Sequence, residues 1–142
     1  MAESPPVGLT YSKTVTVDDA LTVPHLASGI GNLSDMPPVF ATAYLVAFIE
    51  ATCIEALQPY LDANQRTVGV RIDVSHTAAT PVGMRVTAQV ELVSVERRKL
   101  RFKVECRDEV ETIGTGMHDR AIIDAPKFLA RARAKVQKIG RG

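Results

Sequence analysis

Glu50 is the most unusual chemically active residue in this sequence. It is the only charged residue between Met36 and Ile54, in a segment rich in Ala, Leu, Ile and Phe. Removing an unpaired carboxylate from water carries a large free-energy cost, so Glu50 must be paired, protonated or open to a cleft. Carboxylates held in this way gather at functional sites and serve as general bases or nucleophiles. The alternative is a carboxylate that simply reaches the helix surface or a subunit interface.

Thr42 and His76 complete a candidate set. Thr42 precedes Glu50 by eight residues on the same predicted helix, roughly 12 Å along its axis, so the two side chains cannot touch directly. A residue from the sheet or from a partner subunit would have to stand between them. A threonine, a glutamate and a histidine can together supply a nucleophile and acid-base catalysis. The structural alternatives are a Thr42 hydroxyl bonded back to a helical carbonyl and a His76 that is only a core residue.

The direction of His76 follows from a period-two pattern. The residues expected on its side of the strand are Val68, Val70, Ile72 and Val74. Because alternate residues of a strand share a face, the pattern predicts that all of them point toward the helix. The other two histidines are weaker candidates, since His25 lies in a proline-containing loop and His118 lies in a glycine-containing strand near Arg120.

The elements that must position these residues can be predicted from periodicity and turn signals. A first strand is expected over 7–17, a loop over 18–38, a long helix over 39–61, strands over about 67–123 and a basic helix over about 126–138. The loop is either a lid or binding segment or a plain connector. The central helix is apolar on nearly every face, which predicts that protein surrounds it.

This order of elements predicts an α+β fold in which an antiparallel sheet packs against a hydrophobic helix. A sheet curled around that helix would be a hotdog fold, although periodicity alone does not establish the strand order. A single open sheet leaves edge strands, and such edges commonly pair across a two-fold axis. A homodimer is therefore expected.

Length and charge limit the classes of function. The 142 residues, 46% hydrophobic and 23% charged, predict one domain over 1–142. The formal net charge is +1, so no overall field favours nucleic acid or an anionic membrane. Cys53 and Cys106 lie in apolar segments without metal-ligand spacing and are expected to be reduced, which suits the cytoplasm. The N-terminus resembles no signal peptide, and no metal site or transmembrane segment is expected.

Three longer segments carry a family resemblance: VFATAYLVAFIEATCIEAL, VGVRIDVSHTAATPVGMRVT and IGTGMHDRAI. Together they resemble the fluoroacetyl-CoA thioesterase family of hotdog proteins, over about Pro24 to Phe128. The resemblance implies hydrolysis of an acyl-CoA thioester and places the family's threonine, glutamate and histidine on Thr42, Glu50 and His76. These are the residues that the chemistry of the sequence also selects.

The resemblance further implies roles at the acyl end of the substrate. Gly69 and Arg120 would line the acyl pocket, and a glycine within a strand permits close approach of backbone to a ligand. The family's loop carries aromatic residues where Leu33 and Met36 stand in this sequence. Because flexible aliphatic side chains shape a pocket differently, the expected substrate is a short-chain acyl-CoA, with fluoroacetyl-CoA as one member of that class.

The phosphates of CoA would need cations. The candidates are Arg97, Arg98, Lys99, Arg101, Arg131, Arg133, Lys135 and Lys138. The alternative is that these side chains are only solvated surface residues. No phosphate-binding loop or dinucleotide motif is present, so no cofactor is expected beyond the CoA of the substrate.

Two other functions fit the same pattern. A hotdog acyl-CoA hydratase or dehydratase would also use a buried carboxylate and a histidine. A non-catalytic dimer that binds acyl-CoA would need neither residue for chemistry. Release of free thiol distinguishes the thioesterase from both.

Overall fold

The computed structural model describes residues 3–140, except for the side chain of Ser28. The strands are β1 (Thr10–Thr16), β2 (Gln65–Val74), β3 (Arg85–Glu96), β4 (Lys99–Arg107) and β5 (Thr112–Asp124). The helices are α1 (Thr42–Leu57) and α2 (Ala125–Lys138), and short 3₁₀ turns occupy Asp19–Leu21, Val23–His25, Ser28–Ile30 and Gln58–Tyr60. The predicted sequence of elements is confirmed, with a helix that begins later and ends earlier than expected.

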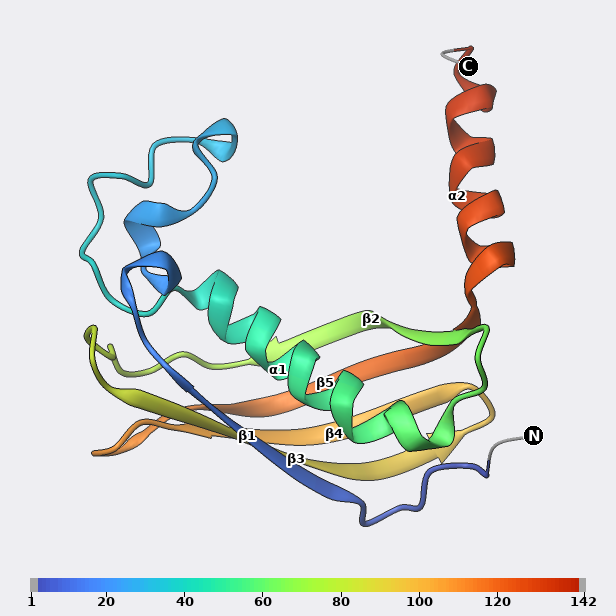
Figure 1. Cartoon of the computed structure of the whole chain (residues 1–142), viewed down its shortest axis with the longest axis horizontal. Coiled ribbons are helices and arrows are strands. Elements are labelled where there is room, and N and C mark those ends of the chain that lie inside the picture. Colours follow the sequence, from blue (N-terminus) through green and yellow to red (C-terminus); the bar gives the residue numbers. More distant parts are fainter. Residues whose placement is uncertain (1–2, 141–142) are drawn as a thin grey trace.

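The strands form one antiparallel sheet in the order β1-β3-β4-β5-β2. The sheet curls along α1, which crosses its concave face (Figure 1). In β4, residues Leu100, Phe102, Val104 and Cys106 are buried while their neighbours are exposed, as the alternation predicts. These residues pack with α1 side chains such as Leu45 and Ile49 into one core. The helix therefore has a fixed place over the sheet.

One side of α1 is uncovered, so the prediction that protein surrounds the helix is wrong for the single chain. Ala43, Ala47 and Ile54 are exposed. Their spacing of four and seven residues puts them on one stripe, which also contains Glu50. The helix is apolar all round, but one sheet covers only part of its circumference. The β2 edge of the sheet is uncovered as well.

The loop before α1 is closed at its base. The amide N–H of Val23 donates to the carbonyl of Val39 (3.1 Å), and the N–H of Ala41 donates to the carbonyl of Leu21 (3.0 Å). These bonds bring the two ends of the loop together, so that residues 24–38 extend from the start of α1 (Figure 1). Thr42 follows directly and is fixed by this closure.

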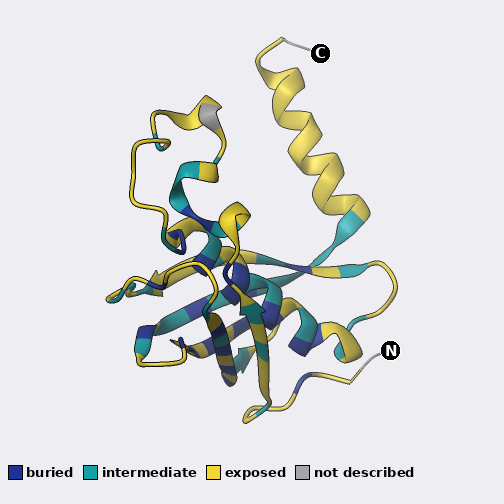
Figure 2. Ribbon diagram, turned by 60° about the vertical axis from the view of Figure 1, so that its left-hand side comes forward, coloured by how far each residue is buried: buried dark blue, intermediate teal, exposed yellow. Residues whose placement is uncertain are grey.

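The C-terminal helix α2 stands away from the sheet (Figure 1). The carboxylate of Asp124 accepts a hydrogen bond from the N–H of Lys127 (3.1 Å) and caps its first turn. No residue of α2 is buried (Figure 2). Among the helices of residues 3–140, none has the length and apolar character needed to span a membrane.

Candidate active site

The hydroxyl of Thr42 and the ring of His76 form a hydrogen-bonded pair. Thr42 Oγ1 lies 2.7 Å from His76 Nδ1. Thr42 is the first residue of α1, so its hydroxyl is not bonded back to a carbonyl of the same helix. Thr52, two residues beyond Glu50, does make that bond, to the carbonyl of Phe48 at 2.7 Å. The structural alternative considered for Thr42 thus applies to a different threonine.

The environment of His76 favours its neutral form. Burial lowers the pKa of its imidazole below the usual 6.5. Phe40 packs against the ring edge to face, with centroids 6.4 Å apart. His76 Nε2 is buried and has no hydrogen-bond partner among the described residues. A neutral imidazole with one nitrogen on a hydroxyl and the other unengaged is suited to moving a proton.

Glu50 is paired rather than isolated. Its Oε1 accepts a hydrogen bond from Arg120 NH1 at 2.9 Å. The Arg120 side chain is only 3% exposed, whereas that of Glu50 is 38% exposed. Arg120 is itself fixed by donating to the hydroxyl of Thr67 (2.8 Å) and to the Thr67 carbonyl (2.7 Å). The guanidinium therefore holds the carboxylate in a defined position, while part of the Glu50 side chain stays exposed to solvent.

Gly69 is placed against this ion pair. A Cβ added at Gly69 would lie 2.6 Å from Glu50 Oε1, 3.3 Å from His118 Cε1 and 3.4 Å from Arg120 NH1. The first of these is too short for any side chain, so glycine lets the carboxylate approach the strand. Gly69 and Arg120, which the resemblance linked to the acyl pocket, are direct neighbours in the sheet register.

A bulge in β2 explains how Gly69 reaches this face. The register with β5 shifts between Gly69 and Arg71, so Val70 is an extra residue that changes the alternation. Gly69 faces α1 before the bulge, and Ile72 pairs with the buried His118 after it. The prediction that Val68 and Val70 share the face of Ile72 is therefore wrong.

His118 belongs to the Glu50 group, although it is a weaker candidate than His76 by sequence. Its Nδ1 donates to the carbonyl of Arg71 (2.8 Å), which leaves Nε2 to accept from Arg120 NH1 (3.1 Å). Burial lowers the pKa of His118, so the ring is a neutral acceptor. The sequence does contain a signal for this position. His118 lies two residues before Arg120, and residues two apart on a strand share a face.

A hollow of about 300 Å³ opens beside the Glu50 carboxylate. Val46 and Ile72 provide apolar walls, and Gly69 and His118 provide the inner side. This volume is that of a small-ligand site. Its apolar wall and single carboxylate fit a short acyl group next to a reactive centre.

The candidate residues therefore form two groups within one chain. Thr42 and His76 make one group, and Glu50, Gly69, Arg120 and His118 make the other. No hydrogen bond or ion pair of the described residues joins the two. Leu33 and Met36 belong to neither, since they lie in the loop before α1, joined by a backbone hydrogen bond of 3.2 Å.

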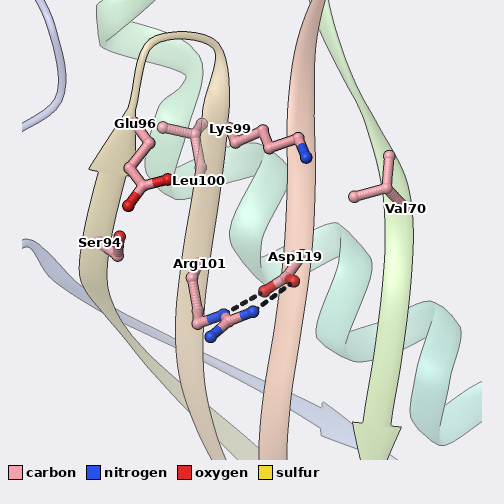
Figure 3. A pocket seen from close by; sticks show the side chains of 7 residues that line it. All are labelled: Val70, Ser94, Glu96, Lys99, Leu100, Arg101 and Asp119. Atoms are coloured by element: carbon pink, nitrogen blue, oxygen red, sulfur yellow. Dashed lines mark hydrogen bonds and ion pairs between the residues drawn. The ribbon is translucent and has the colours of Figure 1, made fainter.

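A hollow of about 230 Å³ on the opposite face of the sheet is a weaker site. Two of its four charged residues, Arg101 and Asp119, bind each other through hydrogen bonds of 2.9 and 3.1 Å (Figure 3). Arg101 is thereby occupied and is a poor candidate for phosphate binding. Among the described residues, no group of His, Cys, Asp and Glu could hold a metal ion.

The buried cysteines serve the core. Cys53 and Cys106 are both free, and burial raises the pKa of each thiol to about 12. A thiol that stays protonated at neutral pH is a poor nucleophile. Nucleophilic chemistry at this site is therefore left to oxygen atoms.

Comparisons with known proteins agree with this geometry. The family model described as fluoroacetyl-CoA-specific thioesterase matches residues 15–126. The fluoroacetyl-CoA thioesterase of Streptantibioticus cattleyicolor is 41% identical over 129 residues, 91% of this chain and 93% of that protein. Its coverage and identity are high enough to establish the family.

Solved structures extend the match. A structure of fluoroacetyl-CoA thioesterase superposes with a TM-score of 0.89 at 40% identity, covering 94% of this chain and 98% of that one. A mutant of that enzyme has been solved with fluoroacetate and CoA. A hotdog-like protein from Thermanaerovibrio acidaminovorans, at 22% identity and a TM-score of 0.77 with 92% of each chain covered, shares the fold. The chain therefore belongs to the fluoroacetyl-CoA-specific thioesterase family, and it is a thioester hydrolase on the hotdog fold.

Proposed function

We propose that this protein hydrolyses a short-chain acyl-CoA to the free acid and CoA, as a cytoplasmic homodimer whose sites draw residues from both subunits. The observation that carries the proposal is the 2.7 Å hydrogen bond between Thr42 Oγ1 and His76 Nδ1. It pairs a nucleophile with a neutral base, which is the arrangement that acyl transfer to a hydroxyl requires.

The uncovered surfaces of the single chain support the dimer. The β2 edge carries Ile72, which is 41% exposed, and the apolar stripe of α1 lies beside it. Antiparallel pairing of two β2 edges would continue the sheet and cover both stripes. A two-fold axis near Ile72 would bring the segment that carries His76 of the partner subunit beside the Gly69 end of β2. The Thr42–His76 pair of one subunit would then meet the Glu50 group of the other.

The first chemical step follows from the Thr42–His76 pair. His76 Nδ1 accepts the hydroxyl proton while Thr42 Oγ1 attacks the thioester carbonyl, and the protonated imidazole then supplies a proton to the departing CoA thiolate. The start of α1 has no side-chain cap, so its free N–H groups and the helix dipole favour negative charge on the carbonyl oxygen. The products of this step are acyl-Thr42 and CoA.

Glu50 serves the second step. Arg120 binds one carboxylate oxygen, Oε1, at 2.9 Å, which leaves Oε2 to accept a proton from water. That water attacks the acyl-Thr42 carbonyl and releases the acid. Rapid quenching followed by peptide mass spectrometry checks this assignment: the acyl mass is expected on the Thr42 peptide, and an acyl mass on the Glu50 peptide would make Glu50 the nucleophile.

The size of the hollow and the side chains of the loop support a short acyl group. The hollow beside Glu50 has a volume of about 300 Å³, and Leu33 and Met36 are the candidates to close it. Fluoroacetyl-CoA is a candidate substrate because the relative from Streptantibioticus cattleyicolor is a fluoroacetyl-CoA thioesterase. The reaction uses only water and side chains of this chain, so the proposal includes no cofactor.

Thiol release from acetyl-, fluoroacetyl-, propionyl-, butyryl- and longer acyl-CoAs tests the proposal. The short members should be hydrolysed, and Glu50→Gln and His76→Ala should each lower kcat/KM by about a hundredfold or more. A protein that binds acyl-CoA and releases no thiol would instead be a binding module. Formation of a 3-hydroxyacyl product from an enoyl-CoA would point to a hydratase.

A further inference from the structure

A second hollow lies at the base of α2, away from the reacting groups. It has a volume of about 390 Å³ and is formed by the end of β5, the first two turns of α2 and the turn between β3 and β4. Three cations line it: Arg98 from the turn, and Lys127 and Arg131 from α2. Residues almost thirty positions apart in the sequence are thus gathered around one space.

These cations have no partners within the described residues. No hydrogen bond or ion pair engages the side chains of Arg98, Lys127 or Arg131. Asp124 is the one carboxylate that lines the hollow, and its Oδ1 already accepts the backbone N–H of Lys127 at 3.1 Å. Lys127 and Arg131 are also an i,i+4 pair of like charge, which destabilises a helix unless an anion lies between them.

The turn that supplies Arg98 has an unusual backbone. Arg97 has a φ of +58°, the left-handed region, and is the only non-glycine residue of the described chain with a positive φ. Two-residue hairpin turns usually take glycine or asparagine at such a position. Here the turn contains two arginines followed by Lys99, which line an adjoining hollow with Glu96. Strain of this kind is retained mainly where a site uses it.

An aromatic ring completes the surroundings. Phe128 lines the same hollow and is 38% exposed. Guanidinium and ammonium groups bind phosphate oxygens through charge-assisted hydrogen bonds, and an exposed aromatic face can stack on a nucleobase. Cations around an open aromatic ring are the recognition chemistry of a phosphorylated nucleotide.

We propose that this hollow binds the 3′-phosphorylated adenosine diphosphate end of CoA, with Arg98, Lys127 and Arg131 on the phosphates and Phe128 against the adenine. The inference rests on the proposed function and deepens it by assigning the nucleotide half of the substrate. The match to the family model ends at residue 126, just before the α2 residues of this hollow.

The spacing along β5 is consistent with one bound CoA. Arg120, which holds Glu50, lies four residues before Asp124 on the same strand, a separation of roughly 14 Å. The extended pantetheine arm of CoA bridges a gap of that order between thioester and pyrophosphate. One molecule can therefore have its acyl end at Glu50 and its phosphates at the base of α2.

A pair of substrates that differ only in the nucleotide tests the proposal. Acetyl-CoA carries the phosphates, and acetyl-pantetheine lacks them. The variant Lys127→Glu with Arg131→Glu should raise KM for acetyl-CoA at least tenfold, with kcat unchanged, and should leave kcat/KM for acetyl-pantetheine within twofold. Because no residue of α2 is buried, this double substitution is not expected to unfold the protein.

Arg133→Glu is the matched control. This substitution reverses one charge on the same helix, where the double variant reverses two, and Arg133 follows Arg131 by two residues and so points about 200° around the axis. Its KM for acetyl-CoA should stay within twofold of wild type. An unchanged KM in the double variant, or an equal loss for both substrates, would overturn the proposal.

Calorimetric titration with free CoA and with pantetheine separates this inference from the catalytic one. If wild-type protein hydrolyses neither thioester, the proposed function fails, but CoA should still bind more tightly than pantetheine and lose that advantage in the double variant. If hydrolysis proceeds and the double variant binds CoA like wild type, the nucleotide subsite is wrong and the catalytic proposal stands.

Discussion

The variant Gly69→Ala tests the link between one backbone position and the Glu50 carboxylate. The added Cβ would lie 2.6 Å from Glu50 Oε1, whereas ordinary contact begins at 3.4 Å. The carboxylate must therefore retreat by about 0.8 Å, the difference between these distances. A misplacement near 1 Å can cost about a hundredfold in rate, so we expect kcat/KM to fall on the order of 10- to 100-fold.

Stability should respond differently to the same change. Glu50 Oε1 is the far end of a flexible side chain, and alanine is about 0.5–1 kcal/mol less costly than glycine within a strand. Tm should therefore change by only a few degrees. Thiol release gives kcat/KM, and differential scanning calorimetry gives Tm. Gly29→Ala, which adds a methyl group into open space, is the control.

A Gly69→Ala protein with full kcat/KM would refute the reasoning, because the carboxylate would then not need its observed position. A protein with a large loss of Tm would also refute it, since the lost activity would reflect the fold. Only the combination of a low rate and a preserved Tm agrees with a displaced carboxylate.

Four further predictions concern the histidines and one buried hydrogen bond. Burial lowers the pKa of His76 below 6.5, so kcat/KM should persist as pH falls through 6.5 and decline only below it; a decline centred above 6.5 in the pH profile would contradict a buried neutral base. The lowered pKa values of His76 and His118 mean that the folded protein binds fewer protons than the unfolded chain, so the free energy of unfolding should fall as pH drops below 6.5 in urea titrations. His118→Phe removes the acceptor of Arg120 NH1 and should lower stability by about 1–3 kcal/mol together with kcat; unchanged kcat would show that Arg120 holds Glu50 without it. Thr80→Val removes a fully buried hydroxyl that donates to Asp108 at 2.9 Å and should lower stability by about 1–3 kcal/mol at unchanged kcat/KM, whereas the exposed Thr14→Val should change neither.

The fold could be predicted from sequence because its main signals are local. The alternation in β4 and the uninterrupted apolar run of α1 each reflect burial within one element. Their combination allowed an antiparallel sheet against a helix, and the longer segments identified the family. The order of the strands depends on pairing between distant segments, which periodicity does not encode.

The site could be predicted in part. Glu50 was found because a charge in an apolar helix needs a partner, and that partner is Arg120. The bulge at Val70 could not be predicted, because one extra residue in a valine-rich strand leaves no local signal. The bulge changes which residues of the first part of β2 point toward α1, and Gly69 therefore lies against Glu50. Alternation alone would have placed Gly69 on the outer face.

The uncovered stripe of α1 shows a second limit of sequence patterns. Apolar residues on all faces of a helix predict complete burial, but they do not tell whether the cover comes from the same chain. Ala47 and Ile54 are exposed in the single chain. The same ambiguity affects the site, because no hydrogen bond or ion pair of the described residues joins the Thr42–His76 pair to the Glu50 group, and the proposed dimer would bring them together.

Mixed dimers of Thr42→Ala and Glu50→Gln test the composite site most directly. Each variant alone should be nearly inactive in thiol release from acetyl-CoA. When the two are unfolded together in equal amounts and refolded, half of the dimers should be mixed, and each mixed dimer should contain one intact Thr42–His76 pair beside one intact Glu50. The account predicts recovery of about a quarter of wild-type activity. Activity no higher than that of the separate variants would contradict it, because every site would then take all its residues from one chain.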